Sequence, residues 1–160
     1  MFLARLLGAL DTSGVAYCVV GGLAVNLHGI PRTTYDVDLV VARNAANLAR
    51  TEALLRGLGL TPRIPVKLAD FADAAHCETM HAERNLIAVT FTNASNPLEE
   101  VDVLVCPPID PDALVARSTL RQAGTLQVHV VALEDLLSMK RAAGREQDLR
   151  DVEYLERLRK

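Results

Sequence analysis

The chain has 160 residues, of which 50% are hydrophobic and 23% charged, a composition close to that of an ordinary globular domain. Its net charge of −3 excludes the overall basic excess that is typical of proteins coating nucleic acids or anionic membranes. The three cysteines are odd in number and widely spaced, which argues against a disulfide framework and predicts reduced thiols in a cytoplasmic protein.

The first third of the chain is predicted to alternate short helices and strands. Its N-terminal apolar stretch carries Arg5 and is too short to span a bilayer, so we expect an amphipathic helix and no membrane partner. Further along, short apolar runs of strand type alternate with segments whose apolar residues have helical spacing. The expected elements are helices over Met1–Leu10, Leu23–His28 and Asn44–Leu58, and strands over Tyr17–Val20 and Val37–Val41.

Beyond residue 60 the chain is predicted to hold a hairpin and a helical C-terminal part. Pro62 and Pro65 interrupt the first segment, in which Ala69–His81 fits either one helix or two short ones. The turn-rich stretch Asn93–Pro97 separates two apolar runs, as in a β-hairpin, and Gly144 is expected to join two helices. The other expected elements are strands over Leu86–Thr92, Val101–Val105 and Leu126–Val131, and helices over Asp110–Arg117 and from Leu133 onward.

These elements together indicate the fold class. Strands interleaved with helices, with one hairpin, are typical of an α/β or α+β fold whose mixed β-sheet is flanked by helices. No linker or repeat divides the chain, so we expect a single domain over residues 1–160. Its core is expected over about residues 15–131 and its C-terminal helices over about residues 133–160.

Two acidic residues, Asp36 and Asp38, lie on either side of Val37 at the start of a predicted strand. Because side chains alternate along a strand, residues two apart share a face, so the two carboxylates are expected side by side. Their repulsion is costly on an otherwise apolar strand unless a cation offsets it. Paired carboxylates acting with nucleotide phosphates are a common way to hold Mg²⁺, which makes a divalent cation the natural candidate.

Two further features extend this acidic pair into a candidate phosphate-transfer site. Gly21-Gly22 lies between a predicted strand and a predicted helix, where missing β-carbons let the backbone approach a bulky anion. Asp102 stands in another apolar strand, and if that strand neighbours the one carrying Asp38, three carboxylates form one cluster. Three acids are enough to hold two metal ions, one activating an attacking hydroxyl and one neutralising a leaving pyrophosphate.

The cysteines and histidines predict no further metal site. Cys18 and Cys106 lie in apolar runs of strand type, where a small buried side chain is the expected role. His76 and His81 are five residues apart, although neighbours on one helix face are three or four apart, and Cys77 adjoins only one of them. We therefore expect no zinc site here.

The combination of Gly21-Gly22, Asp36-Val37-Asp38-Leu39 and a later acid on a strand resembles the core motif of the DNA polymerase β-like nucleotidyltransferase superfamily. The longer string, with Ile30-Pro31-Arg32-Thr33-Thr34-Tyr35 before the acids, is similar to the small bacterial nucleotidyltransferases of the AbiE toxin type (AbiEii). The run from Met139-Lys140 to Asp151 also resembles that branch, in which charged helices follow the core.

The resemblance implies roles for the core residues. Asp36 and Asp38 would bind Mg²⁺ or Mn²⁺, and Asp102 would bind a second metal ion and help to deprotonate the acceptor. These three are therefore the candidate catalytic residues and metal ligands. Gly21 and Gly22 would cradle the β- and γ-phosphates of a nucleoside triphosphate. Many active members have Gly-Ser at this position, whereas this chain has a second glycine.

The resemblance also implies nucleotide-binding cations. Arg32 precedes the acidic pair, where a guanidinium can clamp phosphate oxygens; the alternative is an ordinary ion pair with a surface acid. Lys140 would reach the triphosphate from the terminal helices. Asp148 and Asp151 are one helical turn apart and would support it, orienting Lys140 or Arg145. The alternative for Lys140 is a solvated side chain or an ion pair with Glu134 or Asp148.

The function implied is the transfer of a nucleoside monophosphate from a nucleoside triphosphate to an acceptor hydroxyl, on RNA such as tRNA or on protein. A toxin of this branch would have an antitoxin protein as partner. The first alternative is a catalytically inactive module that binds nucleotide or protein, against which the clustered acids argue, because a scaffold has no reason to bury like charges together. The second alternative is a transferase that modifies small molecules. It would need an acceptor pocket, and little of the chain remains beyond the core to form one.

Overall fold

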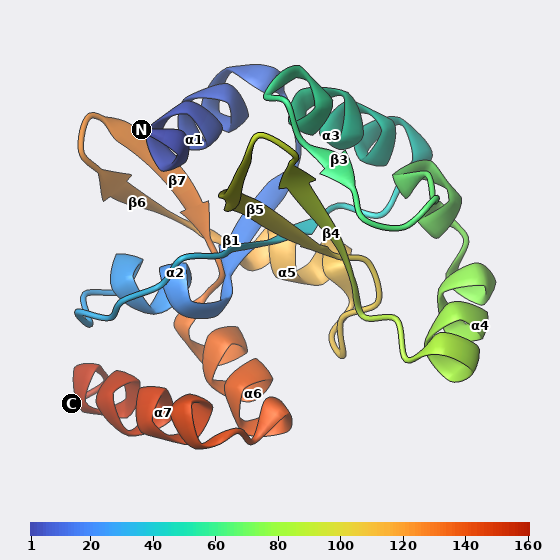
Figure 1. Cartoon of the computed structure of the whole chain (residues 1–160). Helices are drawn as coiled ribbons and strands as arrows, with labels where there is room; N and C mark the ends of the chain where they lie inside the picture. The colour runs from blue at the N-terminus through green and yellow to red at the C-terminus, as the bar shows by residue number, and fades with distance from the viewer.

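The computed structural model describes residues 1–160, and a seven-stranded mixed β-sheet forms its centre (Figure 1). The strands are β1 (Tyr17–Val20), β2 (Val37–Val41), β3 (Thr61–Pro62), β4 (Ala88–Asn93), β5 (Asn96–Leu104), β6 (Thr119–Ala123) and β7 (Leu126–Val130). Their order across the sheet is β3-β4-β5-β2-β1-β7-β6. The pairs β2–β5 and β1–β7 are parallel and the others antiparallel, which confirms the predicted mixed sheet.

Seven α-helices and one short 3₁₀ helix surround the sheet. Figure 1 shows α1 and α3 together at one edge of the molecule, α6 and α7 together at the opposite edge, and α4 at one end of the sheet. None of the helices combines the length and the apolar character that a membrane span requires. The helices are α1 (Phe2–Ser13), α2 (Gly21–Leu27), α3 (Ala45–Gly57), η1 (Leu68–Ala72), α4 (Ala74–Arg84), α5 (Pro111–Arg117), α6 (Leu133–Ala143) and α7 (Glu146–Leu158).

Local signals explain most of these boundaries. The side chain of Asn44 accepts a hydrogen bond from the backbone N–H of Asn47 at 2.8 Å and so begins α3, while Gly144 ends α6 in the left-handed conformation. Of the two forms predicted for residues 69–81, the structure has two short helices. They are separated at Asp73, whose side chain accepts from the N–H of Ala75 and caps α4. Two strands, β3 and β6, lie where the sequence analysis predicted none.

The hydrophobic core is one cluster of 34 buried residues on both faces of the sheet. All four residues of β1 are buried, as expected for a continuous apolar run in a central strand. In β2 the only residue that is not fully buried is Asp38, which interrupts four apolar neighbours. The core therefore holds β1 and β2 rigidly and presents Asp38 at a defined point of the sheet.

Candidate active site

Asp38 and Asp102 are direct neighbours on adjacent strands. The parallel pair β2–β5 puts them in register, so their side chains share one face of the sheet. Thr90 of β4 stands opposite Asp102 on the other side, and its hydroxyl donates a hydrogen bond to Asp102 Oδ1 at 2.5 Å. The strand of Asp102 therefore adjoins the strand of Asp38, which the sequence analysis had left as a condition. Thr90 is an addition for which the sequence had no signal.

The surroundings of Asp38 disfavour its negative charge. Burial raises the pKa of Asp38 to about 6, with further contributions from the negative charges of Asp102 and Asp36. The positive charges of Lys140 and Arg145 act in the opposite direction without cancelling the effect. A carboxylate of this kind gains stability from any cation that reaches it.

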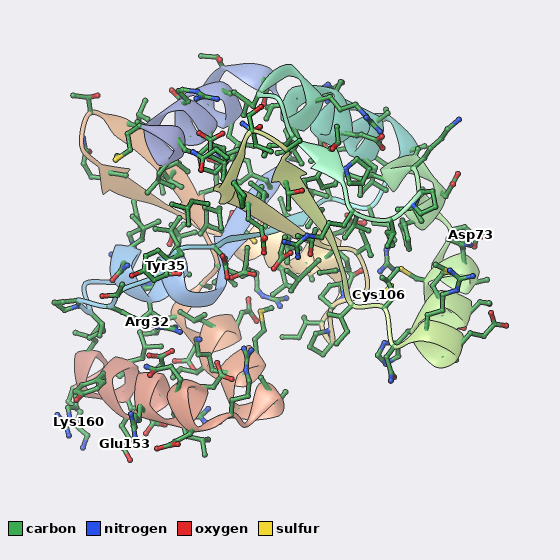
Figure 2. All side chains as sticks on the ribbon, in the orientation of Figure 1. Arg32, Tyr35, Asp73, Cys106, Glu153 and Lys160 are labelled. Atoms are coloured by element: carbon green, nitrogen blue, oxygen red, sulfur yellow. The ribbon has the colours of Figure 1, made fainter.

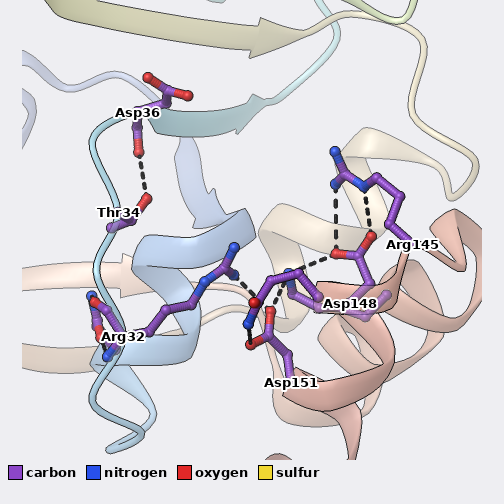
Figure 3. Close-up of polar contacts among 9 residues, drawn as sticks. Arg32, Thr34, Asp36, Arg145, Asp148 and Asp151 are labelled. Atoms are coloured by element: carbon purple, nitrogen blue, oxygen red, sulfur yellow. Dashed lines mark hydrogen bonds and ion pairs between the residues drawn. The ribbon is translucent and has the colours of Figure 1, made fainter.

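Asp36 lies outside the strand that carries Asp38. It precedes Val37, the first residue of β2, and its side chain is exposed. Its backbone carbonyl accepts a hydrogen bond from the hydroxyl of Thr34 at 3.3 Å, and its carboxylate points away from the C-terminal helices (Figure 3). The structure thus aligns Asp38 with Asp102 in register, whereas Asp36 acts on Asp38 from the preceding loop.

The two glycines leave room for two different neighbours. Gly21 has φ +66°, and a β-carbon built on it would lie 2.1 Å from Asp38 Oδ2. At Gly22 a β-carbon would lie 2.9 Å from the hydroxyl of Thr34 and 3.1 Å from Arg32 Nη1. The first glycine therefore lets the backbone approach the carboxylate, and the second makes space for the guanidinium of Arg32.

A cluster of five charged residues lies beside these glycines, and we call it the charged cluster (Figure 3). Lys140 Nζ contacts Asp148 Oδ1 at 3.0 Å and Asp151 Oδ2 at 2.9 Å. Arg32 Nη1 contacts the same Asp151 oxygen at 2.6 Å, and Arg145 Nε contacts Asp148 Oδ2 at 2.7 Å. Lys140 thus contacts both acids of α7 and Arg145 contacts Asp148; the ion pair of Lys140 with Asp148 is common to the supporting role and to the alternative given in the sequence analysis.

The charged cluster is largely buried yet carries an excess positive charge. Lys140, Asp148 and Asp151 are nearly inaccessible, whereas the side chain of Arg145 is 79% exposed. Although burial acts against it, hydrogen bonds from Arg145 and Lys140 lower the pKa of Asp148, and Asp148 in turn raises the pKa of Arg145. Three cations face two carboxylates, so one positive charge remains, with Arg145 the most accessible member.

A pocket of about 850 Å³ connects the acidic strand to the charged cluster. Gly21 and Asp38 line it together with Lys140, Arg145 and Asp148. Its volume falls within the usual range for small-molecule sites. The predicted site residues Gly22, Arg32, Asp36, Asp102 and Asp151 are outside its lining. Further lining residues are largely apolar and include Ile87, Leu104, Pro107, Pro108, Leu136 and Met139.

The donor atoms fit a magnesium ion that arrives with its substrate. The cluster of three carboxylates suggested by the sequence is not formed, because Asp36 lies outside β2: no group of three or more His, Cys, Asp or Glu side chains is arranged to hold a metal ion by itself. Mg²⁺ in nucleotide sites takes only one or two carboxylates from the protein and completes its octahedron with phosphate oxygens and water. The register pair of Asp38 and Asp102, one of them with a raised pKa, provides two such carboxylates.

Comparison with known proteins identifies the family and agrees with the fold. The family model described as nucleotidyl transferase AbiEii toxin, type IV toxin–antitoxin system, matches residues 5–159. The solution structure of the antibiotic-resistance factor ANT(2'')-Ia is similar, with TM-score 0.62 and 11% identity over 96% of this chain and 80% of that one. A candidate nucleotidyltransferase from Thermotoga maritima has TM-score 0.58 and 16% identity over 98% and 88% of the two chains. No curated protein matches in sequence.

Proposed function

The chain belongs to the AbiEii family of nucleotidyltransferase toxins and is itself a nucleotidyltransferase, and from that premise we propose the reaction of this site. We propose that it transfers a nucleoside monophosphate from a Mg²⁺-bound nucleoside triphosphate to a hydroxyl group of an RNA or a protein. The observation that carries this proposal is the register pair of Asp38 and Asp102 beside a pocket that also contains Gly21, Lys140 and Arg145.

The nucleotide is proposed to bind between the acids and the charged cluster. Its triphosphate lies beside Gly21, whose missing β-carbon lets the backbone approach Asp38, and faces the exposed guanidinium of Arg145. Lys140 is held in place by Asp148 and Asp151 and adds a fixed positive charge to the wall of the pocket. The apolar part of the pocket is wide enough to accept the rest of the nucleotide.

Asp38 and Asp102 would hold the magnesium ion, and Asp36 would add its negative charge from the loop. Bound there, Mg²⁺ would neutralise charge that develops on the phosphate oxygens and the leaving pyrophosphate. Burial, followed by repulsion from Asp102 and Asp36, raises the pKa of Asp38, and a cation at this position would offset both, so binding of the metal and ionisation of Asp38 support each other.

Asp102 is proposed to receive the proton of the acceptor. The hydroxyl of Thr90 occupies Oδ1, and no hydrogen bond engages Oδ2, so one oxygen is oriented and the other is available. As the acceptor oxygen bonds to the α-phosphorus, the bond between that phosphorus and the bridging oxygen to the β-phosphate breaks, and pyrophosphate leaves. The hydroxyl proton passes to Asp102 Oδ2.

The family description also supports a proposed partner. Because the family is that of toxins in type IV toxin–antitoxin systems, we propose that an antitoxin protein counteracts this chain. Nothing in the site favours RNA over protein as the acceptor, so the acceptor class is an outcome of the experiment below.

Label transfer tests the proposal. The purified protein is incubated with each NTP in turn, labelled at the α- or the γ-phosphate, with Mg²⁺ and an extract containing RNA and protein. We expect a labelled RNA or protein band with one or more α-labelled NTPs and none with γ-labelled NTPs. The band should be lost in Asp38→Asn and retained in Asp70→Asn, a control acid that is exposed and distant in sequence.

Two results would contradict the proposal. Label transferred from the γ-phosphate would indicate phosphoryl transfer instead. If no NTP gives a band while Mg²⁺-NTP still raises the unfolding temperature, the chain is a nucleotide-binding module without turnover; saturation at 100 times Kd adds about 2.7 kcal/mol of stability.

A further inference from the structure

Cys77 and Cys106 meet inside the fold, although 29 residues separate them in the chain. Their sulfur atoms are 2.8 Å apart, within about 0.8 Å of the length of a disulfide bond. Both are free cysteines, and both line the pocket that contains Asp38 and Lys140. Cys18, the third cysteine, is fully buried in β1 and takes no part in this contact.

The contact joins two elements that are otherwise weakly connected. Cys77 is the only buried residue of α4, and its thiol donates a hydrogen bond to the carbonyl of Val105 at 2.8 Å. Cys106 follows β5, the strand that carries Asp102, and Figure 2 shows it between the sheet and α4. Arg43 braces the same point, with Nη2 at 3.0 Å from the Val105 carbonyl and 3.6 Å from Cys77 Sγ.

We propose that Cys77 and Cys106 are a redox-sensitive pair that forms a reversible disulfide and ties α4 to the end of β5. The bond needs only a small approach of two sulfurs that already touch. Its effect is to fix α4, whose only fully buried side chain is that of Cys77, covalently as one wall of the pocket. This inference does not depend on the proposed nucleotidyl transfer, because it concerns the two thiols alone.

A peroxide of low molecular weight is a sufficient oxidant. The partly exposed Cys106 attacks the peroxide as thiolate: an S–O bond forms, the O–O bond breaks, and the departing hydroxide takes the proton that the thiol had lost, giving the first water. The sulfur of Cys77 then attacks the sulfur of Cys106, the S–S bond forms, the S–O bond breaks, and the departing hydroxide takes the Cys77 proton as the second water. Two thiols lose two electrons and one peroxide gains them.

The surroundings of Cys106 control the rate of this oxidation. Burial, followed by the neighbouring Cys77, raises the pKa of Cys106 to about 12, and Arg43 offsets only part of this. Because the thiolate is the reactive form, oxidation should be slow near neutral pH and faster as the pH rises. The pair is thus stable as dithiol under mild conditions.

Mass spectrometry of the intact and digested protein tests the inference. The reduced, folded protein is treated with hydrogen peroxide, quenched, denatured and alkylated. We expect the loss of two hydrogen atoms, one alkylated cysteine instead of three, and full reversal by dithiothreitol. Cleavage after Lys67, Arg84 and Arg117 separates the two cysteines, so the linked pair of peptides 68–84 and 85–117 identifies the bond. The unfolding temperature should rise by up to about 10 °C on oxidation.

Single variants provide the controls. Cys106→Ser should abolish the disulfide, as should Cys77→Ser, whose hydroxyl can still donate to the Val105 carbonyl. Cys18→Ala should leave the disulfide intact. The inference is overturned if three cysteines remain alkylated after oxidation, if the bond involves Cys18, or if Cys106 is oxidised to sulfinic acid while Cys77 stays free.

Discussion

The backbone of Gly21 lies against the carboxylate of Asp38, so that a β-carbon on residue 21 would stand 2.1 Å from Oδ2. The same glycine has φ +66°, a conformation that side chains of L-residues rarely adopt. Position 21 therefore requires glycine for two independent reasons, one in the backbone and one in the neighbouring strand.

Gly21→Ala should damage both folding and the site. The strained backbone and the contact with Asp38 should lower the free energy of unfolding by about 1–3 kcal/mol and reduce transfer activity by more than about tenfold. Urea denaturation and the label-transfer rate measure the two effects. Gly8→Ala is the matched control: no atom lies within 4 Å of its added β-carbon, and α1 should become more stable by about 0.5–1 kcal/mol. Equal losses in both variants would contradict this reading of Gly21.

Asp38→Asn should stabilise the nucleotide-free protein while abolishing transfer. The folded state holds the proton of Asp38 up to about pH 6, whereas the unfolded chain releases it near the ordinary pKa of 3.8. Wild-type stability therefore falls as the pH rises from about 4 to 6 and stays reduced above that. The side-chain amide of the variant carries no titrating proton, so the loss of stability between about pH 4 and 6 disappears in Asp38→Asn. The free energy of unfolding of the variant should exceed that of wild type by about 1–3 kcal/mol at pH 7.5 and equal it near pH 4. Denaturation at both pH values, with Asp70→Asn as control, measures the difference.

Lys140→Met should be strongly destabilising. Removing the ammonium leaves Asp148 and Asp151 buried close together with only Arg32 and Arg145 to compensate, which typically costs about 3–5 kcal/mol. Lys67→Met, at an exposed position without an ion pair, should change the free energy of unfolding by less than about 0.5 kcal/mol. If Lys140→Met lowers the free energy of unfolding no more than Lys67→Met does, the contacts of Lys140 in the charged cluster add nothing to stability.

Asp148→Asn should change the acid sensitivity of the protein. Because the folded-state pKa of Asp148 lies below its ordinary value, its ionic contacts stabilise the protein above about pH 4 and are lost as the pH falls through the folded-state pKa. The variant should be less stable than wild type at pH 7, and the gap should narrow below about pH 4. Thermal unfolding across this range, with the exposed Glu153→Gln as control, tests the direction. If the difference in stability between wild type and Asp148→Asn stays constant with pH, the contribution of Asp148 is not ionic.

The sequence predicts the two central strands well, because their apolar residues are continuous in the sequence and buried in the structure. The bounds of β1 and β2 match the predicted runs, since a central strand covered on both faces is a continuous apolar stretch. β6 was missed because its residues are mostly exposed and lack alternation, and it exists by pairing with β7 around the turn at Gly124.

For the candidate site, the sequence identifies residue types and the structure adds their partners. Asp36 was expected on the strand with Asp38, but β2 begins only at Val37, and on one side β1 ends at Val20 opposite Asp38, so β1 offers residue 36 no partner. The pairing of Lys140 with Asp148 can be predicted from the sequence, because the two residues are only eight positions apart on consecutive helices. The contact of Cys77 with Cys106 cannot be predicted in this way, because it depends on where α4 meets the end of β5.

The ion pair between Arg32 and Asp151 joins residues 119 positions apart, and this separation has a consequence during synthesis. At about 5–20 residues per second, a ribosome needs roughly 6–24 s to extend the chain from one to the other. Until α6 and α7 are made, the nascent chain contains Asp36 and Asp38 but none of the charged residues of these two helices. The pocket, which Asp148 of α7 helps to line, is therefore assembled last, and the proposed nucleotide site is complete only when α7 has left the ribosome.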